Sequence, residues 1–230
     1  MRVSLFVAAM LSAFLWSGCG GEDNPSGGGN GGGDNNGGNN GGGGTYDFVE
    51  LGGLKWMKKN LNIQTANSWC YDGNNSNCAT YGRLYTWDAA KTVCPSGWRL
   101  PDTSDWNKLM RAVGGRDSVA ERNERNVLYL LGAGKALKST SGWNDYCPNL
   151  YSPTDCRNGN GSDDLGFSAL PSGNRFANGS FRNIGNSGLW WAATEFGGDE
   201  AYVPNMGYGT DAGIVESYIK GFGFSVRCVQ

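Results

Sequence analysis

The 230-residue sequence contains no histidine, and charged residues make up only 17% of it. Without an imidazole, Ser-His-Asp and Cys-His nucleophile pairs, histidine-ligated zinc and ordinary haem ligation are excluded. The formal net charge is −2, so the chain offers no basic field for nucleic acid or anionic lipid. Glycine, with 39 residues, and aromatic side chains, with 12%, are abundant instead. This composition is typical of an aromatic-rich protein whose surface is polar but uncharged.

The sequence begins with an apolar run of fourteen residues, 3–16, after a short positive start. The run is too short to span a bilayer comfortably and predicts a signal peptide over residues 1–18. The segment Trp16-Ser17-Gly18-Cys19 is similar to a bacterial lipoprotein signal, although Trp16 stands where leucine is usual. We expect cleavage before Cys19, lipidation of that residue and anchoring to the bacterial envelope, at the outer membrane or cell surface. The alternative is an ordinary secretory signal followed by an incidental cysteine.

Residues 19–44 are expected to form a lipidated cysteine and a flexible tether. Of the 25 residues from 20 to 44, 14 are glycine and six are asparagine. Such a segment cannot bury enough apolar surface to offset the entropy of ordering it. At about 5–6 Å times the square root of the residue number, it separates anchor and domain by about 25–30 Å. Residues 45–230 then form one domain, held away from the membrane to meet an external partner.

Six cysteines lie within residues 45–230, and an exported protein keeps them in an oxidising compartment. Their even number predicts disulfides rather than a metal site, although the count alone leaves many connectivities possible. Spacing favours one of these, which pairs Cys70 with Cys78, Cys147 with Cys156, and Cys94 with Cys228. The first two pairs each close a short polar turn. For the last pair, the chain-entropy model gives a stabilisation of about 5 kcal/mol.

Local patterns predict an α+β fold. Residues 48–51 and 54–57, joined by Gly52-Gly53, predict a hairpin. Helices are expected at 87–93, at about 103–113 with Thr103 or Ser104 as N-cap, and around 125–131. A long loop region is expected from about 138 to 188, which is uncommon unless it is functional or pinned. Short strands are expected at 189–194, 201–203, 213–218 and 223–229.

Six sequence strings in order along residues 46–229 carry a family resemblance. They are Ser68-Trp69-Cys70-Tyr71, Cys78-Ala79-Thr80-Tyr81-Gly82-Arg83-Leu84-Tyr85-Thr86-Trp87, Cys94-Pro95-Ser96-Gly97-Trp98-Arg99-Leu100-Pro101, Gly166-Phe167-Ser168-Ala169-Leu170-Pro171, Trp190-Trp191-Ala192-Ala193-Thr194-Glu195 and Gly223-Phe224-Ser225-Val226-Arg227-Cys228. Together they resemble the Fibrobacter succinogenes major paralogous domain family. The resemblance implies an exported bacterial surface module or lipoprotein.

That family is also similar, more distantly, to the C-type-lectin and formylglycine-generating-enzyme-like folds. The similarity implies a lectin-like domain with two to three helices, short antiparallel strands and a long loop region. In lectin-like domains a cysteine after the first helix pairs with one in the last strand, which agrees with Cys94 and Cys228. The Glu-Pro-Asn motif of calcium-dependent lectins has no counterpart here, and Trp143-Asn144-Asp145, which matches another lectin motif, stands in the wrong order. Formylglycine-generating oxidases need two reactive cysteines near the C-terminus, where this chain has only Cys228.

A candidate calcium site lies in the segment Asn158-Gly159-Asn160-Gly161-Ser162-Asp163-Asp164, which alternates oxygen-bearing side chains with glycine. This spacing lets a loop wrap a hard cation, with Asn158, Asn160, Asp163 and Asp164 as ligands. The segment lacks the distal glutamate of an EF-hand. The alternative is a solvated turn whose side chains cap their own backbone.

Trp190 and Trp191 form the candidate ligand platform. Adjacent residues of a strand point to opposite faces, and an exposed indole suits the apolar face of a sugar ring. The side chains expected to line the same cleft are those of Tyr202, Asn205, Tyr208 and Asp211, and Glu195 is a further candidate ligand residue. The alternative places one indole in the core and the other under the long loop. Glu195 can also pair with Arg99 or Arg227, which we prefer to a catalytic role.

Three functions are compatible with these observations. The first is a non-enzymatic module that binds polysaccharide or a cell-surface partner, as in adhesion. The second is a structural envelope protein without glycan recognition. The third is an oxidase related to the formylglycine-generating enzymes, which the missing cysteine pair disfavours. A membrane is the expected partner of the lipidated N-terminus, nucleic acid is not expected, and calcium is the one candidate cofactor.

Overall fold

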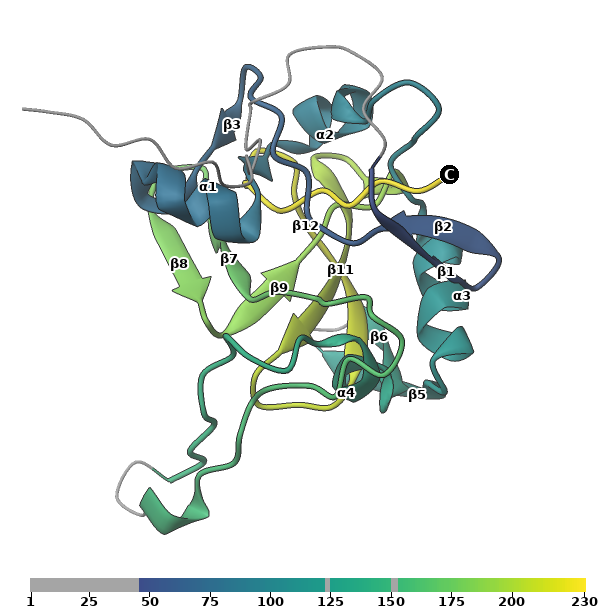
Figure 1. Cartoon of the computed structure of the whole chain (residues 1–230), viewed down its shortest axis with the longest axis vertical. Coiled ribbons are helices and arrows are strands. Elements are labelled where there is room, and N and C mark those ends of the chain that lie inside the picture. The colour runs from purple at the N-terminus through teal and green to yellow at the C-terminus, as the bar shows by residue number, and fades with distance from the viewer. Residues whose placement is uncertain (1–45, 123–124, 150–152) are drawn as a thin grey trace, which may run out of the picture. The chain divides into compact units, whose positions relative to one another are not determined.

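The computed structural model of the chain describes residues 46–122, 125–149 and 153–230 (Figure 1). The signal peptide, Cys19 and the tether through residue 44 lie outside these residues. Within the described ranges, no helix is both long and apolar enough to cross a membrane.

The described residues form four α-helices, two short 3-10 helices and twelve strands, so the fold is mixed α+β, as the sequence predicts. The helices are α1 (Asn75–Tyr81), α2 (Trp87–Val93), α3 (Thr103–Ala112), α4 (Ala133–Leu137), η1 (Tyr71–Gly73) and η2 (Pro153–Asp155). The strands are β1 (Phe48–Leu51), β2 (Leu54–Met57), β3 (Ser68–Trp69), β4 (Leu84–Tyr85), β5 (Arg116–Arg122), β6 (Arg125–Leu131), β7 (Ser172–Arg175), β8 (Phe181–Ile184), β9 (Ser187–Leu189), β10 (Glu195–Gly197), β11 (Glu200–Gly207) and β12 (Gly213–Ile219).

The central sheet is antiparallel, with the strand order β10-β11-β12-β6-β5 and with β9 paired to β11. Three hairpin-like pairs, β1-β2, β3-β4 and β7-β8, surround it. In the β11–β12 register, Val203 lies opposite Glu216 and Met206 opposite Gly213. Because side chains alternate along a strand, Val203 and Met206 face opposite sides of the sheet. Two hydrophobic clusters therefore form, one on each face.

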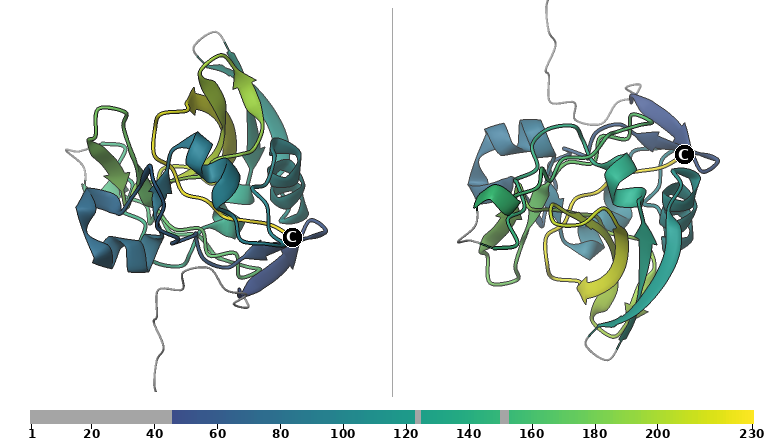
Figure 2. Two further views of the ribbon diagram at one scale, coloured as in Figure 1. Left: turned by 90° about the horizontal axis from the view of Figure 1, so that it is seen from above. Right: turned by 90° about the horizontal axis from the view of Figure 1, so that it is seen from below.

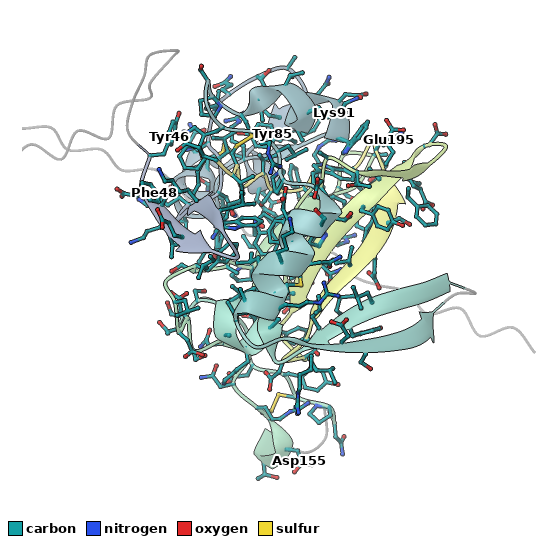
Figure 3. The ribbon with its side chains drawn as sticks, turned by 90° about the vertical axis from the view of Figure 1, so that its right-hand side faces the viewer. Tyr46, Phe48, Tyr85, Lys91, Asp155 and Glu195 are labelled. Carbon is teal, nitrogen blue, oxygen red and sulfur yellow. A yellow bond between two sulfur atoms is a disulfide. The ribbon has the colours of Figure 1, made fainter. Side chains whose placement is uncertain are left out.

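The first cluster joins one face of the sheet to α3 and α4. Met206 and Val215 of the sheet pack with helix residues Trp106, Leu109 and Leu137. Figure 3 shows α3 lying across β11 and β12, while η2, which contains Asp155, projects away from the sheet. The second cluster lies on the other face and contains α2 and the chain from 224 to 228. Burying apolar area on both faces is the main stabilising contribution of this arrangement.

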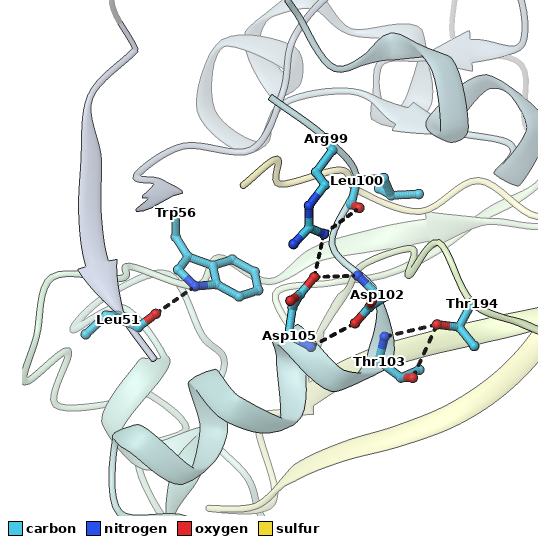
Figure 4. A network of polar contacts seen from close by, with 8 residues as sticks. All are labelled: Leu51, Trp56, Arg99, Leu100, Asp102, Thr103, Asp105 and Thr194. Atoms are coloured by element: carbon cyan, nitrogen blue, oxygen red, sulfur yellow. Dashed lines mark hydrogen bonds and ion pairs between the residues drawn. The ribbon is translucent and has the colours of Figure 1, made fainter. Parts of the chain in front are cut away.

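Helix α3 begins with a capping box, drawn in Figure 4. The Asp102 side chain accepts a hydrogen bond from the Asp105 backbone, and Asp105 accepts one from the Asp102 backbone. The N-cap is therefore Asp102, not Thr103 or Ser104 as expected. Arg99 forms an ion pair with Asp105 at 2.5 Å, which raises the pKa of the Arg99 guanidinium, chiefly through their hydrogen bond. The start of α3 is thus fixed by side chains from the preceding extended segment.

The last eight residues, 223–230, run through the middle of the domain rather than along one sheet. Their backbone exchanges hydrogen bonds with Lys55 of β2, with Tyr85 of β4 and with Arg99 before α3. Ser225 also forms a bridge with Trp190. Figure 2 shows this yellow segment threading between elements from the beginning and middle of the chain. The C-terminal segment therefore completes both clusters at once.

All three expected disulfides are present: Cys70–Cys78, Cys94–Cys228 and Cys147–Cys156. The Cys94–Cys228 bond closes a separation of 134 residues and ties the end of α2 to the C-terminal segment. The turn between Cys70 and Cys78 is more ordered than expected, because α1 begins at Asn75, with Asn74 as its N-cap.

The expected helix around 125–131 is wrong, since these residues form strand β6. Residues 127–131 are apolar throughout, so a helical period cannot be read from them. Pairing with β5 and β12 decides the conformation, with Leu130 fully buried against α3 and α4. Three further corrections concern the later part of the chain. The expected loop region contains β7 and β8, and the strand part of the expected strand 189–194 ends at Leu189. The expected strand at 223–229 is instead a segment that makes only isolated bridges.

Candidate functional site

Both members of the tryptophan pair are fully buried, so neither presents a platform to a ligand. Trp190 belongs to the cluster with α3, and Trp191 belongs to the cluster with α2. The Trp190 indole donates to the Asn60 side-chain oxygen at 2.8 Å, and the Trp191 indole donates to the Tyr85 carbonyl at 2.7 Å. The expectation of opposite faces is confirmed. The proposed exposure is wrong, because both faces of the sheet are covered here.

The other expected ligand residues separate in space. Glu195 is exposed and pairs with Lys220 at 3.2 Å, not with Arg99 or Arg227. Tyr202 packs edge-on to Phe196 on the α3 side of β11. Tyr208 lies beyond the end of β11 and packs against Tyr146. Asn205, by contrast, lines a cavity on the opposite side of β11 from Tyr202.

This cavity, hereafter the cleft, has a volume of about 350 Å³ and lies between the β7–β8 hairpin and one face of the central sheet. Its polar lining consists of Asn174, Asn183, Ser187, Asn205, Glu216 and Tyr218, and its apolar lining of Phe176, Leu189, Phe222 and Phe224. The Phe176 and Phe222 rings pack edge to face, with 5.1 Å between their ring centroids. A few polar groups among aromatic side chains are typical of a small-molecule site.

One wall of the cleft comes from neighbouring strands of the sheet. The Glu216 carboxylate accepts hydrogen bonds from the Tyr218 hydroxyl at 2.9 Å and from the Asn205 amide nitrogen at 3.4 Å. These bonds direct the Asn205 nitrogen toward Glu216. Within the described chain, the Asn205 amide oxygen accepts no hydrogen bond and is available to a donor in the cleft.

The opposite wall comes from the β7–β8 hairpin. Asn174 is only 4% exposed, and its amide oxygen accepts a hydrogen bond from the Asn183 side chain at 2.9 Å. The Asn174 amide nitrogen has no acceptor among the described residues. The nitrogen is not fully buried and Asn174 lines the cleft, so we place this donor at the cleft wall.

The expected calcium segment is organised by its own hydrogen bonds. The Asn158 side chain accepts from the Asn160 backbone, and the Asn160 side chain accepts from the Trp143 backbone at 2.9 Å. The Asp163 carboxylate accepts from the backbone and hydroxyl of Ser168. Asp164 is exposed. This pattern matches the capped-turn alternative.

A cation nevertheless holds this region together, and it is the ammonium group of Lys138. Lys138 is 1% exposed and donates to the carbonyls of Gly159, Gly207 and Thr210 at 2.7, 3.1 and 3.1 Å. Burial lowers the pKa of Lys138 to about 8, and the nearby Asp211 carboxylate opposes this shift. Within the described residues, no group of three or more Cys, Asp or Glu side chains is placed to hold a metal ion. The segment thus supplies the Gly159 carbonyl oxygen, which accepts a hydrogen bond from the Lys138 ammonium.

A second buried cation lies near Trp190. Arg227 is fully buried and donates to the Asn60 side-chain oxygen and to the carbonyls of Phe167 and Ser168. Burial lowers the pKa of the Arg227 guanidinium, with the Asp163 carboxylate opposing this. An arginine stays charged at neutral pH even so. The same Asn60 oxygen accepts from Trp190, so this residue joins the two side chains.

The sequence-based reasoning missed Asn174, Asn183 and the phenylalanines of the cleft. A usable signal was present, since Asn178-Gly179 lies between two segments that form β7 and β8. An Asn-Gly pair between short alternating segments is a strong hairpin signal. No local sequence pattern predicts that this hairpin and strands β11 and β12 line the same cleft.

A family model described as the Fibrobacter succinogenes major domain matches residues 49–230. The chain belongs to this family. No curated protein and no solved structure matches it.

In this major domain, the six strings that carry the resemblance mainly build the interior. Arg99, within the string at 94–101, pairs with Val229, which directly follows the last string. Ser225 of the last string pairs with Trp190, which begins the string at 190–195. Of the residues that line the cleft, Phe224 alone falls within a string. The strings therefore account for the scaffold, and the cleft is built mostly from the segments between them.

Proposed function

We propose that this major domain is a non-enzymatic binding module that recognises a saccharide unit of a polysaccharide or surface glycan in the cleft. The observation that carries the proposal is that one cleft combines amide groups able to form hydrogen bonds with aromatic side chains in its walls. Asn174 offers a donor and Asn205 an acceptor, while Phe176 and Phe222 supply apolar rings. Sugars present hydroxyl groups that donate and accept, together with C–H faces that pack on aromatic rings.

Two features favour binding over catalysis. Among the described residues, Glu216 is the one carboxylate that lines the cleft, whereas glycoside hydrolysis generally uses two. The six cysteines of the described residues are all in disulfides, which leaves no thiol in this region for an oxidase of the formylglycine-generating type. A lectin-like relationship remains part of the proposal, supported by the bond between Cys94, after α2, and Cys228 near the end.

Glycan-array screening of the protein and of Asn205→Ala tests the cleft. We expect wild-type retention on at least one glycan and a loss of about tenfold or more in affinity for Asn205→Ala, because the hydrogen bond to the Asn205 oxygen is lost and the ligand donor is left without its partner. Asn62→Ala is the matched control, since Asn62 is exposed and outside the cleft. A folded Asn205→Ala with unchanged affinity would place the ligand elsewhere. No retention on any glycan would favour a structural envelope role.

We also propose that Cys19 carries a lipid and that residues 20–44 tether the domain to the envelope, at the outer membrane or cell surface. The support is the sequence around Cys19, since a short apolar run precedes the cysteine and a glycine-rich segment comes directly after it. Metabolic labelling with a tagged fatty acid should mark the wild type but not Cys19→Ala. Equal labelling of the two proteins would refute the anchor.

A further inference from the structure

The amide of Asn174 presents a fixed donor to the cleft. Its oxygen is occupied by the Asn183 side chain at 2.9 Å, and its nitrogen faces the cleft without an acceptor among the described residues. The residue is otherwise enclosed, with 4% of its surface exposed. Because no described residue accepts from this nitrogen, a ligand that offers an acceptor there gains a hydrogen bond.

The orientation of this amide depends on an unusual backbone conformation at Asn183. The β7–β8 register pairs Ser172 with Ile184 and Asn174 with Arg182, which leaves Asn183 opposite Gly173. In a regular ladder Asn183 would face the opposite side from Asn174. Asn183 and Gly173 instead have φ values of 67° and 66°. Asparagine is among the few residues other than glycine that tolerate this region, and here its side chain reaches Asn174.

The neighbours of this donor restrict the chemistry of the group that it binds. Phe176, Leu189 and Phe224 line the same cleft as Asn174. A hydroxyl group can accept from the Asn174 nitrogen, but its own proton then also needs an acceptor. A carbonyl oxygen needs only the donor, and a methyl group next to it gains from contact with apolar side chains. An acetamido group combines these two features, and its own N–H group can donate to an acceptor such as the Asn205 amide oxygen of the same cleft.

We propose that the cleft selects 2-acetamido sugars, with the Asn174 amide nitrogen donating to the acetamido carbonyl oxygen and with Asn183 as the positioning residue. This inference rests on the proposed function, because it names the class of saccharide for the same cleft. Asn183 does not need to touch the ligand. Its role is to occupy the Asn174 oxygen, so that the nitrogen faces the cleft.

Calorimetry of the full-length protein with N,N′-diacetylchitobiose and with cellobiose tests this selection. The two disaccharides share a β-1,4 backbone and differ at C2, where one has acetamido groups and the other has hydroxyl groups. We expect about tenfold or greater preference for diacetylchitobiose, as for one well-placed hydrogen bond in a buried site. Equal affinity, or a preference for cellobiose, would overturn the inference while leaving saccharide binding intact. Absence of binding to these and to all other glycans would remove the proposed function as well.

Two substitutions of Asn183 test its positioning role. Asn183→Asp cannot donate a hydrogen bond, so Asn174 must turn its nitrogen toward the new carboxylate and present its oxygen to the cleft. We expect the preference for diacetylchitobiose to fall to about twofold or less, or to reverse.

Asn183→Gly keeps the backbone conformation but frees the Asn174 amide, so a weaker, intermediate preference is expected. The control Asn62→Ala should keep the full preference. A folded Asn183→Asp protein, judged by its thermal midpoint, that keeps the wild-type preference would refute the positioning role.

Discussion

The two buried cations of the domain, Arg227 and Lys138, use the same kind of partner in different settings. Each donates to uncharged oxygens, and among the described residues neither is bonded to a carboxylate. The Arg227 guanidinium spans the interior, because its nitrogens reach Asn60 from one part of the chain and the Phe167 carbonyl from another. The Lys138 ammonium donates to backbone carbonyls of Gly159, of Gly207 at the end of β11 and of Thr210.

The difference follows from the shapes and acidities of the two groups. A guanidinium has five donors in a rigid fork and keeps its charge, so it can fix the directions of several segments under any physiological condition. An ammonium is a compact point charge whose pKa falls on burial. The interior next to Trp190 is therefore held by a permanent cation, and the segments near Gly159 by one that can lose its proton.

Arg227→Met should produce the largest effect. The substitution removes the donors for Asn60 and for two carbonyls in a fully buried place, and we expect the free energy of unfolding to fall by about 4 kcal/mol. Urea unfolding at neutral pH measures this loss. Arg227→Lys is the charge-preserving control and should recover little, since one ammonium cannot bond to both Asn60 and Phe167. Full recovery by lysine would show that charge alone matters here.

Lys138→Met should cost less at neutral pH, about 2 kcal/mol, because three carbonyls lose a donor but a buried charge is also removed. The stability difference between wild type and variant should also change with pH. The folded pKa of about 8 lies below the ordinary 10.5, so the unfolded chain binds more protons between these values. Wild-type stability should therefore rise relative to Lys138→Met across this window, by about 3 kcal/mol. A pH-independent difference between the two proteins would contradict the lowered pKa.

Apart from the Cys94–Cys228 bond, which spans 134 residues, the parts of the fold that the sequence predicts correctly depend on neighbouring residues. The hairpin of β1 and β2 has a glycine turn, α2 ends before Pro95, and the two short disulfides join cysteines eight and nine residues apart. These features depend on turn chemistry, capping and loop closure, which act locally. The expected N-cap of α3 differs from the observed one for a similarly local reason, since Asp102, Thr103 and Ser104 are all good caps.

The predictions that are wrong depend on what lies across the sheet. Trp190 and Trp191 have the composition of a sugar platform, and only the presence of α3 on one face and α2 on the other shows that both are core residues. Distant arginines are the expected partners of Glu195, but the turn after β12 brings Lys220 to it. Of the expected ligand residues, Asn205 alone lines the cleft. Its partners come from segments that meet only in the folded chain.

The position of residues 223–230 has a consequence for the order of folding. These residues supply backbone partners to β2, to β4 and to the approach to α3, and they carry Arg227 and Cys228. They follow every element that they join in the order of the chain. The interior therefore stays incomplete until this segment docks, because Asn60 and Trp190 lack the guanidinium that links them to the chain end.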